Sequence, residues 1–96
     1  MRLGGGLSFW IVYLGVIELM AKLPSKKKFL QILGENIYRE RNALHLSREY
    51  VSEKIGLSVA ALAAAESGKV EITSTTLVRF AKAVGCRLED LFRGLI

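Results

Sequence analysis

The sequence has few of the residues that build disulfides and metal sites. It contains one cysteine (Cys86), one histidine (His45) and one proline among its 96 residues. A single cysteine cannot form an internal disulfide, so the fold does not depend on an oxidising compartment. Cys86 is expected to act as a small buried hydrophobe. Without a second cysteine or histidine, the usual zinc-ligand patterns are missing, and we expect no metal and no cofactor.

The sequence also lacks a recognisable catalytic arrangement. The three glycines at positions 4–6 are not followed by the Lys and Ser/Thr that a phosphate-binding loop needs. Glu89 and Asp90 fall at the start of an expected helix, where capping and the helix dipole explain paired acids. A short chain of small helices also leaves little room for a substrate pocket. These absences predict that the protein is not an enzyme.

What is present is a globular, basic composition. About half of the residues are apolar, a quarter are charged, and the formal net charge is +5. This length and composition fit one small folded domain. The positive charge favours an anionic partner, either nucleic acid or a membrane surface.

The composition changes at Pro24. Before it lies an apolar stretch, residues 3–23, and after it comes "SKKK". We divide the chain into an N-terminal extension, 1–24, and a domain, 25–96. Three interpretations of the extension stay open. In the first, it is upstream sequence before a native start at Met20. In the second, it packs on the domain or on a second copy through residues such as Trp10. In the third, it is a membrane anchor flanked by lysines.

The domain shows helical periodicity throughout. Leu30, Leu33, Ile37 and Leu44 fall on one stripe of the first of these helices. Serine or threonine precedes the second, third and fourth, as N-caps do, and glycine follows each of them. Helices are expected at 26–42, 48–54, 59–66, 74–84 and 88–95. Ile72 is expected to plug the loop between the third and fourth.

The two short helices joined through Gly56-Leu57-Ser58 have the pattern of a helix-turn-helix. The segments "LGENIYRER", "LSREYVSEKIGLS", "ESGK" and "TLVRFAKAVGCRLEDLF" resemble the phage-repressor or Cro-type helix-turn-helix domain, the xenobiotic-response-element family. The resemblance runs from Leu33 to Phe92. It implies an all-α, five-helix, lambda-repressor-like domain, here preceded by an apolar extension.

The resemblance also implies roles for individual residues. Arg48 corresponds to a residue that touches the DNA backbone or an outer base at the start of a helix. Arg41 and Glu66 match a buried ion pair found in some members. The other DNA-contacting positions are those facing the major groove and those meeting phosphates: Val59, Ala60, Ala61 and Ala64 for the groove, and Ser47, Ser58 and Lys69 for phosphates.

The helix that should read DNA departs from the family. From Ala60 to Ala65 every residue except Leu62 is alanine. Guanine and adenine edges are read by Arg, Lys, Asn or Gln, whereas these side chains can touch only thymine methyl groups. Sequence discrimination is therefore expected to be shallow, or to come from Arg48, the loop 69–73 or DNA shape. Alternatively, the alanines stabilise a short helix or form a surface for another protein.

Together these features predict a regulator that binds double-stranded DNA as a homodimer, cytoplasmic and associated with the nucleoid. The dimer surface is expected either on the extension, at Trp10, or on the last helix, at Leu91, Phe92 and Leu95. The alternative is an adaptor or antitoxin-like protein whose helix-turn-helix contacts protein. A membrane-tethered regulator is a third interpretation.

Overall fold

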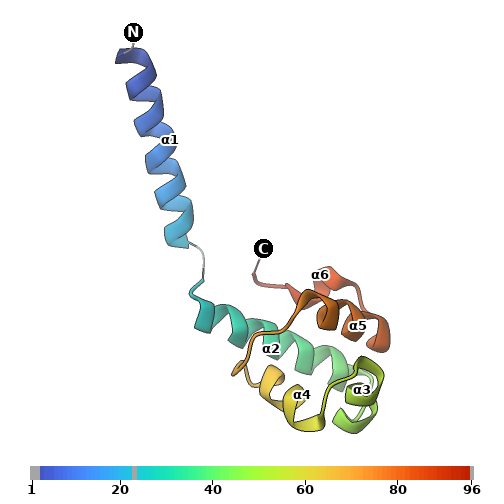
Figure 1. The fold of residues 1–96 in the computed structure, drawn as a ribbon. Coiled ribbons are helices and arrows are strands. Elements are labelled where there is room, and N and C mark those ends of the chain that lie inside the picture. Colours follow the sequence, from blue (N-terminus) through green and yellow to red (C-terminus); the bar gives the residue numbers. More distant parts are fainter. Residues whose placement is uncertain (1–2, 23, 96) are drawn as a thin grey trace.

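The computed structural model describes residues 3–22 and 24–95, which form six α-helices and no strand within those ranges. Figure 1 shows α2 running through the middle of the domain, with α4 on one side and α5 and α6 on the other, while α3 lies at the far end and packs on both α4 and α5. The predicted all-α class is confirmed. The helices are α1 (Leu3–Lys22), α2 (Lys26–Ala43), α3 (Arg48–Ile55), α4 (Val59–Glu66), α5 (Ser74–Val84) and α6 (Leu88–Leu91).

The extension forms α1, which points away from the domain (Figure 1). Its large apolar side chains from Phe9 to Leu19 are exposed, and Trp10 packs edge-on against Tyr13 with ring centroids 5.5 Å apart. The described residues include no helix that is both long and apolar enough to cross a membrane.

The predicted helix boundaries in the helix-turn-helix follow from side-chain caps. Ser47 accepts a hydrogen bond from the backbone N–H of Tyr50, and Ser58 accepts one from Ala61. Gly56 ends α3 in the left-handed conformation, at φ 75°, which costs glycine nothing. Thr73 is the residue that caps α5, through the N–H of Thr76.

The core is a set of apolar side chains contributed by α2 through α6. It comprises Leu33, Ile37, Val51, Ile55, Leu62, Leu77, Phe80, Ala81, Val84 and Leu91. Leu57 and Ile72 pack against it from the turn and the loop, as the sequence predicts. Leu44 is a correction: α2 stops at Ala43, so Leu44 leaves the apolar stripe and is exposed.

Close approach of two helices positions the helix-turn-helix against α2. A Cβ on Gly34 of α2 would lie 2.5 Å from the carbonyl oxygen of Ala65 and 2.7 Å from that of Glu66. Only glycine permits this separation, because no side chain fits between the two backbones. The contact holds the C-terminal end of α4 on α2.

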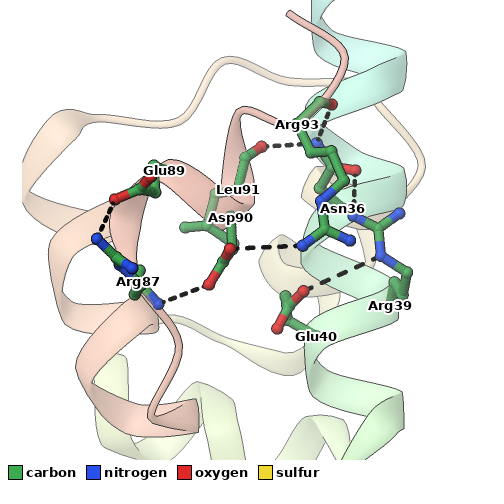
Figure 2. A network of polar contacts seen from close by, with 8 residues as sticks. All are labelled: Asn36, Arg39, Glu40, Arg87, Glu89, Asp90, Leu91 and Arg93. Atoms are coloured by element: carbon green, nitrogen blue, oxygen red, sulfur yellow. Dashed lines mark hydrogen bonds and ion pairs between the residues drawn. The ribbon is translucent and has the colours of Figure 1, made fainter.

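The last helix is shorter than predicted, because α6 ends at Leu91 instead of Leu95. Figure 2 shows the reason: the buried amide of Asn36 donates to the carbonyl oxygens of Leu91 at 2.7 Å and Arg93 at 2.9 Å. These carbonyls thus receive donors from α2 in place of a continuing helix. Gly94, at φ 86°, turns the chain beyond this point.

Candidate nucleic-acid interface

The helix-turn-helix has two helix N-termini, one after Ser47 at the start of α3 and one after Ser58 at the start of α4. Ser47 and Ser58 are exposed, and each uses its hydroxyl oxygen as a cap. Their hydroxyl hydrogens stay available to donate to another acceptor. Free N–H groups at helix N-termini, together with the helix dipole, favour a bound phosphate.

Arg41 and Glu66 form the ion pair that the sequence predicts. The Nε of Arg41 donates to one carboxylate oxygen of Glu66 at 2.6 Å, and its Nη2 donates to the other at 3.1 Å. Both side chains are buried. A third bond, from Nη1 to the carbonyl oxygen of Leu46 at 2.6 Å, reaches the segment before α3. The hydrogen bond to Glu66 raises the pKa of Arg41 and outweighs the lowering by burial.

Arg48 is a second partner of Glu66, which sequence reasoning missed. Its Nε donates to Glu66 Oε1 at 2.9 Å, from the first turn of α3 to the last turn of α4. The Arg48 side chain is 41% exposed, whereas that of Glu66 is 3% exposed. The residues are 18 positions apart, so no local pattern indicates the contact.

The outer face of α4 carries almost no polar group. Val59 and Ala60 are exposed, while Ala61, Ala63 and Ala64 are half-buried. Leu62 and Ala65 point into the core. Of the α4 residues predicted to face DNA, Val59 and Ala60 are exposed and Ala61 and Ala64 are accessible only in part, and the surface that they offer is apolar.

The loop after α4 adds a basic residue and a cleft. Lys69 follows Gly68 and is exposed, with no ion pair to any described residue. Beside α4 lies a cleft of about 140 Å³. Its lining comes from the turn, α4, the loop and α5: Leu57, Ala61, Ala65, Val70, Glu71, Ile72, Thr73 and Thr76.

Comparison with protein-family models matches residues 37–91 to the HTH_3 helix-turn-helix model. This covers more than half of the chain. The chain belongs to the HTH_3 helix-turn-helix family. The predicted resemblance is thereby confirmed.

Several solved structures share this fold. The restriction-modification controller protein C.AhdI from Aeromonas hydrophila has a TM-score of 0.63 and 24% identity, over 66% of this chain and 96% of that one. The clp gene regulator ClgR from C. glutamicum has a TM-score of 0.65 and 21% identity, over 73% of this chain and 87% of that one. An HTH_3 family transcriptional regulator from Vibrio cholerae has a TM-score of 0.67 and 21% identity, over 73% and 39%. No curated protein gives a significant match.

Within this HTH_3 chain, the predicted dimer residues are placed very differently. Leu91 is fully buried in the core, so the expectation that it forms a dimer surface is corrected. Its side chain belongs to the apolar core, and its backbone carbonyl accepts a hydrogen bond from Asn36 of α2. Phe92 and Leu95 are half-buried against the core. Trp10 is exposed on α1, remote from the helix-turn-helix along the chain.

The fold also gathers a group that sequence spacing did not indicate. Glu40, Cys86 and Asp90 bring their potential ligand atoms within 4.8 Å of one another. Asp90 already accepts from the N–H of Arg87 and the guanidinium of Arg93 (Figure 2). Desolvation by burial raises the pKa of the Cys86 thiol, and Glu40 and Asp90 raise it further. We assign no metal here, since the described carboxylates have cationic partners.

Proposed function

We propose that the protein is a DNA-binding transcriptional regulator. The proposal rests on one observation: a helix-turn-helix of the HTH_3 family has two capped helix N-termini and a half-exposed arginine, and an exposed lysine that forms no ion pair with a described residue follows α4. The domain 25–96 would occupy operator DNA and thereby block or recruit polymerase.

Phosphate contacts would supply most of the affinity. Ser47 and Arg48 meet the backbone at the start of α3, Ser58 meets it at the start of α4, and Lys69 meets it from the following loop. Each neutralised phosphate makes binding more sensitive to salt, because it releases condensed counterions. Such contacts set the register of the protein on the duplex and carry no sequence information.

Base readout would come from α4 and would be weak. Val59, Ala60, Ala61 and Ala64 form an apolar strip that can pack on thymine methyl groups but can form no side-chain hydrogen bond to a base edge. The protein would therefore prefer DNA sites that carry thymine at a few particular positions. It would combine this preference with DNA deformability.

The regulator would act as a homodimer in the cytoplasm, in association with the nucleoid. Two-fold symmetry lets two recognition helices meet two half-sites about one helical turn apart. The extension, residues 1–24, would supply the dimer contact, because α1 carries exposed apolar side chains including Trp10 and Tyr13. Contiguous exposed apolar surface of this kind marks an interaction site.

Titration of purified full-length protein against random duplex DNA tests the proposal. We expect micromolar or tighter binding at low salt that weakens steeply as salt is raised. Selection of preferred sequences from the bound fraction would give the operator. Absence of binding at low salt would reject the proposed function.

The second candidate is an adaptor or antitoxin-like protein. It is favoured by the cleft beside α4, which is lined by Leu57, Ala61 and Val70 and could accept an apolar side chain. Arg48→Ala combined with Lys69→Ala separates the candidates. The double variant should weaken DNA binding if the chain is a regulator, and should leave protein binding unchanged if it is an adaptor.

A further inference from the structure

Among the residues that the structure describes, Glu66 is the carboxylate to which both Arg41 of α2 and Arg48 of α3 donate hydrogen bonds. Its carboxylate accepts three hydrogen bonds, two from Arg41 and one from Arg48. The side chain is almost completely buried, so these bonds replace the water that a carboxylate would otherwise hold. The group is therefore ordered by its neighbours on two helices.

Arg41 alone is sufficient to neutralise the buried charge of Glu66. It is buried, it meets both carboxylate oxygens, and its remaining nitrogen donates to Leu46. Arg48 brings a second positive charge to the same carboxylate, which leaves the cluster of two arginines and one glutamate with a net charge of +1. That surplus charge lies on the partly exposed member, Arg48.

The contact with Glu66 uses only one nitrogen of Arg48. The Nε donates to the carboxylate, and the two terminal nitrogens have no hydrogen bond to any described residue. A guanidinium held at Nε keeps a fixed plane, so its terminal nitrogens present two donors in a defined direction. Arg48 is also the first residue of α3, where a cation is disfavoured by the helix dipole unless an anion is close by.

We propose that Glu66 is a positioning residue for DNA binding. It holds Arg48 through Nε, so that the terminal nitrogens of Arg48 and the backbone N–H groups at the start of α3 grip one phosphate together. The inference rests on the proposed DNA-binding function. Holding the side chain before binding reduces the ordering cost that a free arginine would carry at the interface.

The sign of one substitution distinguishes positioning from simple electrostatics. Glu66→Gln removes a negative charge near the DNA, so if Glu66 acted only through its charge the variant would bind DNA more tightly. If Glu66 positions Arg48, the variant binds less tightly, by about three- to tenfold. The amide of glutamine is uncharged and has one accepting oxygen, for which Arg41 also competes, so the Arg48 guanidinium is held less firmly. The two readings therefore predict opposite changes.

A double-mutant cycle provides the test, using full-length protein and DNA titrations across a salt series at a temperature where every variant is folded. We expect Arg48→Ala to weaken binding and to reduce the slope of log affinity against log salt by about 0.9, the share of one phosphate. In the Arg48→Ala background, Glu66→Gln should not weaken binding further. Lys54→Ala is the matched control, since it removes one charge from the opposite end of α3.

A second measurement needs no DNA and separates this inference from the proposed function. The Nε–H resonance of Arg48 should be resolved and slow to exchange in the wild-type protein, and should exchange fast in Arg48-labelled Glu66→Gln. If Arg48 exchanges fast in the wild type, Glu66 does not hold it and the inference is wrong. If the Nε–H is protected but Glu66→Gln binds DNA as well as or better than wild type, the positioning role is also rejected. If the wild-type protein does not bind DNA at all, the proposed function is rejected. A protected Nε–H would even then establish that Glu66 holds Arg48.

Should Glu66→Gln fail to fold, Arg48→Lys replaces it. Lysine keeps the charge, but its single ammonium group cannot hold Glu66 and also offer a two-nitrogen fork. We expect Arg48→Lys to recover less than half of the affinity lost in Arg48→Ala, on a logarithmic scale. Full recovery would show that charge alone matters and would overturn the inference.

Discussion

The side chain of Glu66 connects three of the helices of this small domain. Three of its hydrogen bonds join α4 to α2 and α3, so its removal would leave two arginines without their shared anion. Breaking a buried pair at one partner is costly because an unpaired charge remains. Cys86 is set by its surroundings in another way: burial raises the pKa of its thiol, and the nearby carboxylates of Glu40 and Asp90 raise it further.

Arg41→Ala should strongly destabilise the domain. The variant leaves the buried carboxylate of Glu66 with only the single bond from Arg48 and removes the donor to Leu46. We expect a loss of about 3–5 kcal/mol in the free energy of unfolding, measured by urea titration. Lys82→Ala, which removes an exposed cation from α5, should change it by less than about 0.5 kcal/mol. Equal effects of the two substitutions would contradict a structural role for the ion pair.

Cys86 should react slowly with alkylating agents. Its pKa is raised, mainly by burial, so less thiolate is present at a given pH than in an unfolded chain. Stability from the protonated thiol is complete below the unfolded pKa and is lost as pH rises through the higher folded pKa. The rate of iodoacetamide labelling against pH should reach half of its maximum at higher pH in native protein than in urea-unfolded protein. A midpoint at or below that of the unfolded chain would be the contrary result.

At the scale of elements, two helices determine the interface in different ways. α2 sets the position of α4, since Gly34 lets their backbones approach. Under the proposed function, α4 sets which base edges the protein can read, because its exposed side chains are short and apolar. The first effect is steric and the second is chemical, so different substitutions test them.

Gly34→Ala should destabilise the domain although alanine is the better helix former. Its Cβ would lie 2.5 Å from a backbone oxygen of α4, which cannot move aside as a flexible side chain can. We expect a loss of about 1–3 kcal/mol by thermal or urea unfolding. Gly15→Ala on α1 is the control, since nothing lies within 4 Å of its Cβ. That variant should leave the domain transition unchanged and increase helicity, as measured by circular dichroism.

Thymine methyl groups should carry much of the base preference of α4. Replacing thymine by uracil in a selected operator removes the C5-methyl groups and leaves every hydrogen-bonding group in place. We expect affinity for the selected site to fall toward that for random DNA, with the salt slope unchanged because phosphate contacts persist. If affinity for the uracil-substituted site is unchanged, the specificity comes from the loop 69–73 or from recognition of DNA shape.

The whole molecule consists of a packed domain and a helix that points away from it (Figure 1). The exposed large apolar side chains are concentrated on α1. We therefore expect that dimerisation through α1 can be removed without unfolding the domain. Residues 1–24 would then influence DNA binding through assembly, and the domain would supply every contact to DNA.

Removal of the residues before Met20 should abolish dimerisation and leave the domain folded. We expect the full chain to sediment as a dimer and the shortened chain as a monomer in analytical ultracentrifugation. The thermal midpoint of the domain should stay within a few degrees, since the core draws on α2 to α6. DNA affinity should fall, because one half-site is then bound alone. A shortened chain that is still dimeric would move the interface to the domain.

Local chemistry accounts for what the sequence by itself determined. The period of apolar residues, the caps Ser47 and Ser58 and the left-handed Gly56 act within a few residues, so helix type and the boundaries of α3 and α4 followed directly. The pair Arg41–Glu66 followed from family resemblance. The tertiary structure alone decided that Arg48 joins Glu66, that Asn36 ends α6 at Leu91 and that Leu91 is buried. These contacts join residues 18 to 55 positions apart, and side chains so distant meet only where helix packing brings them together.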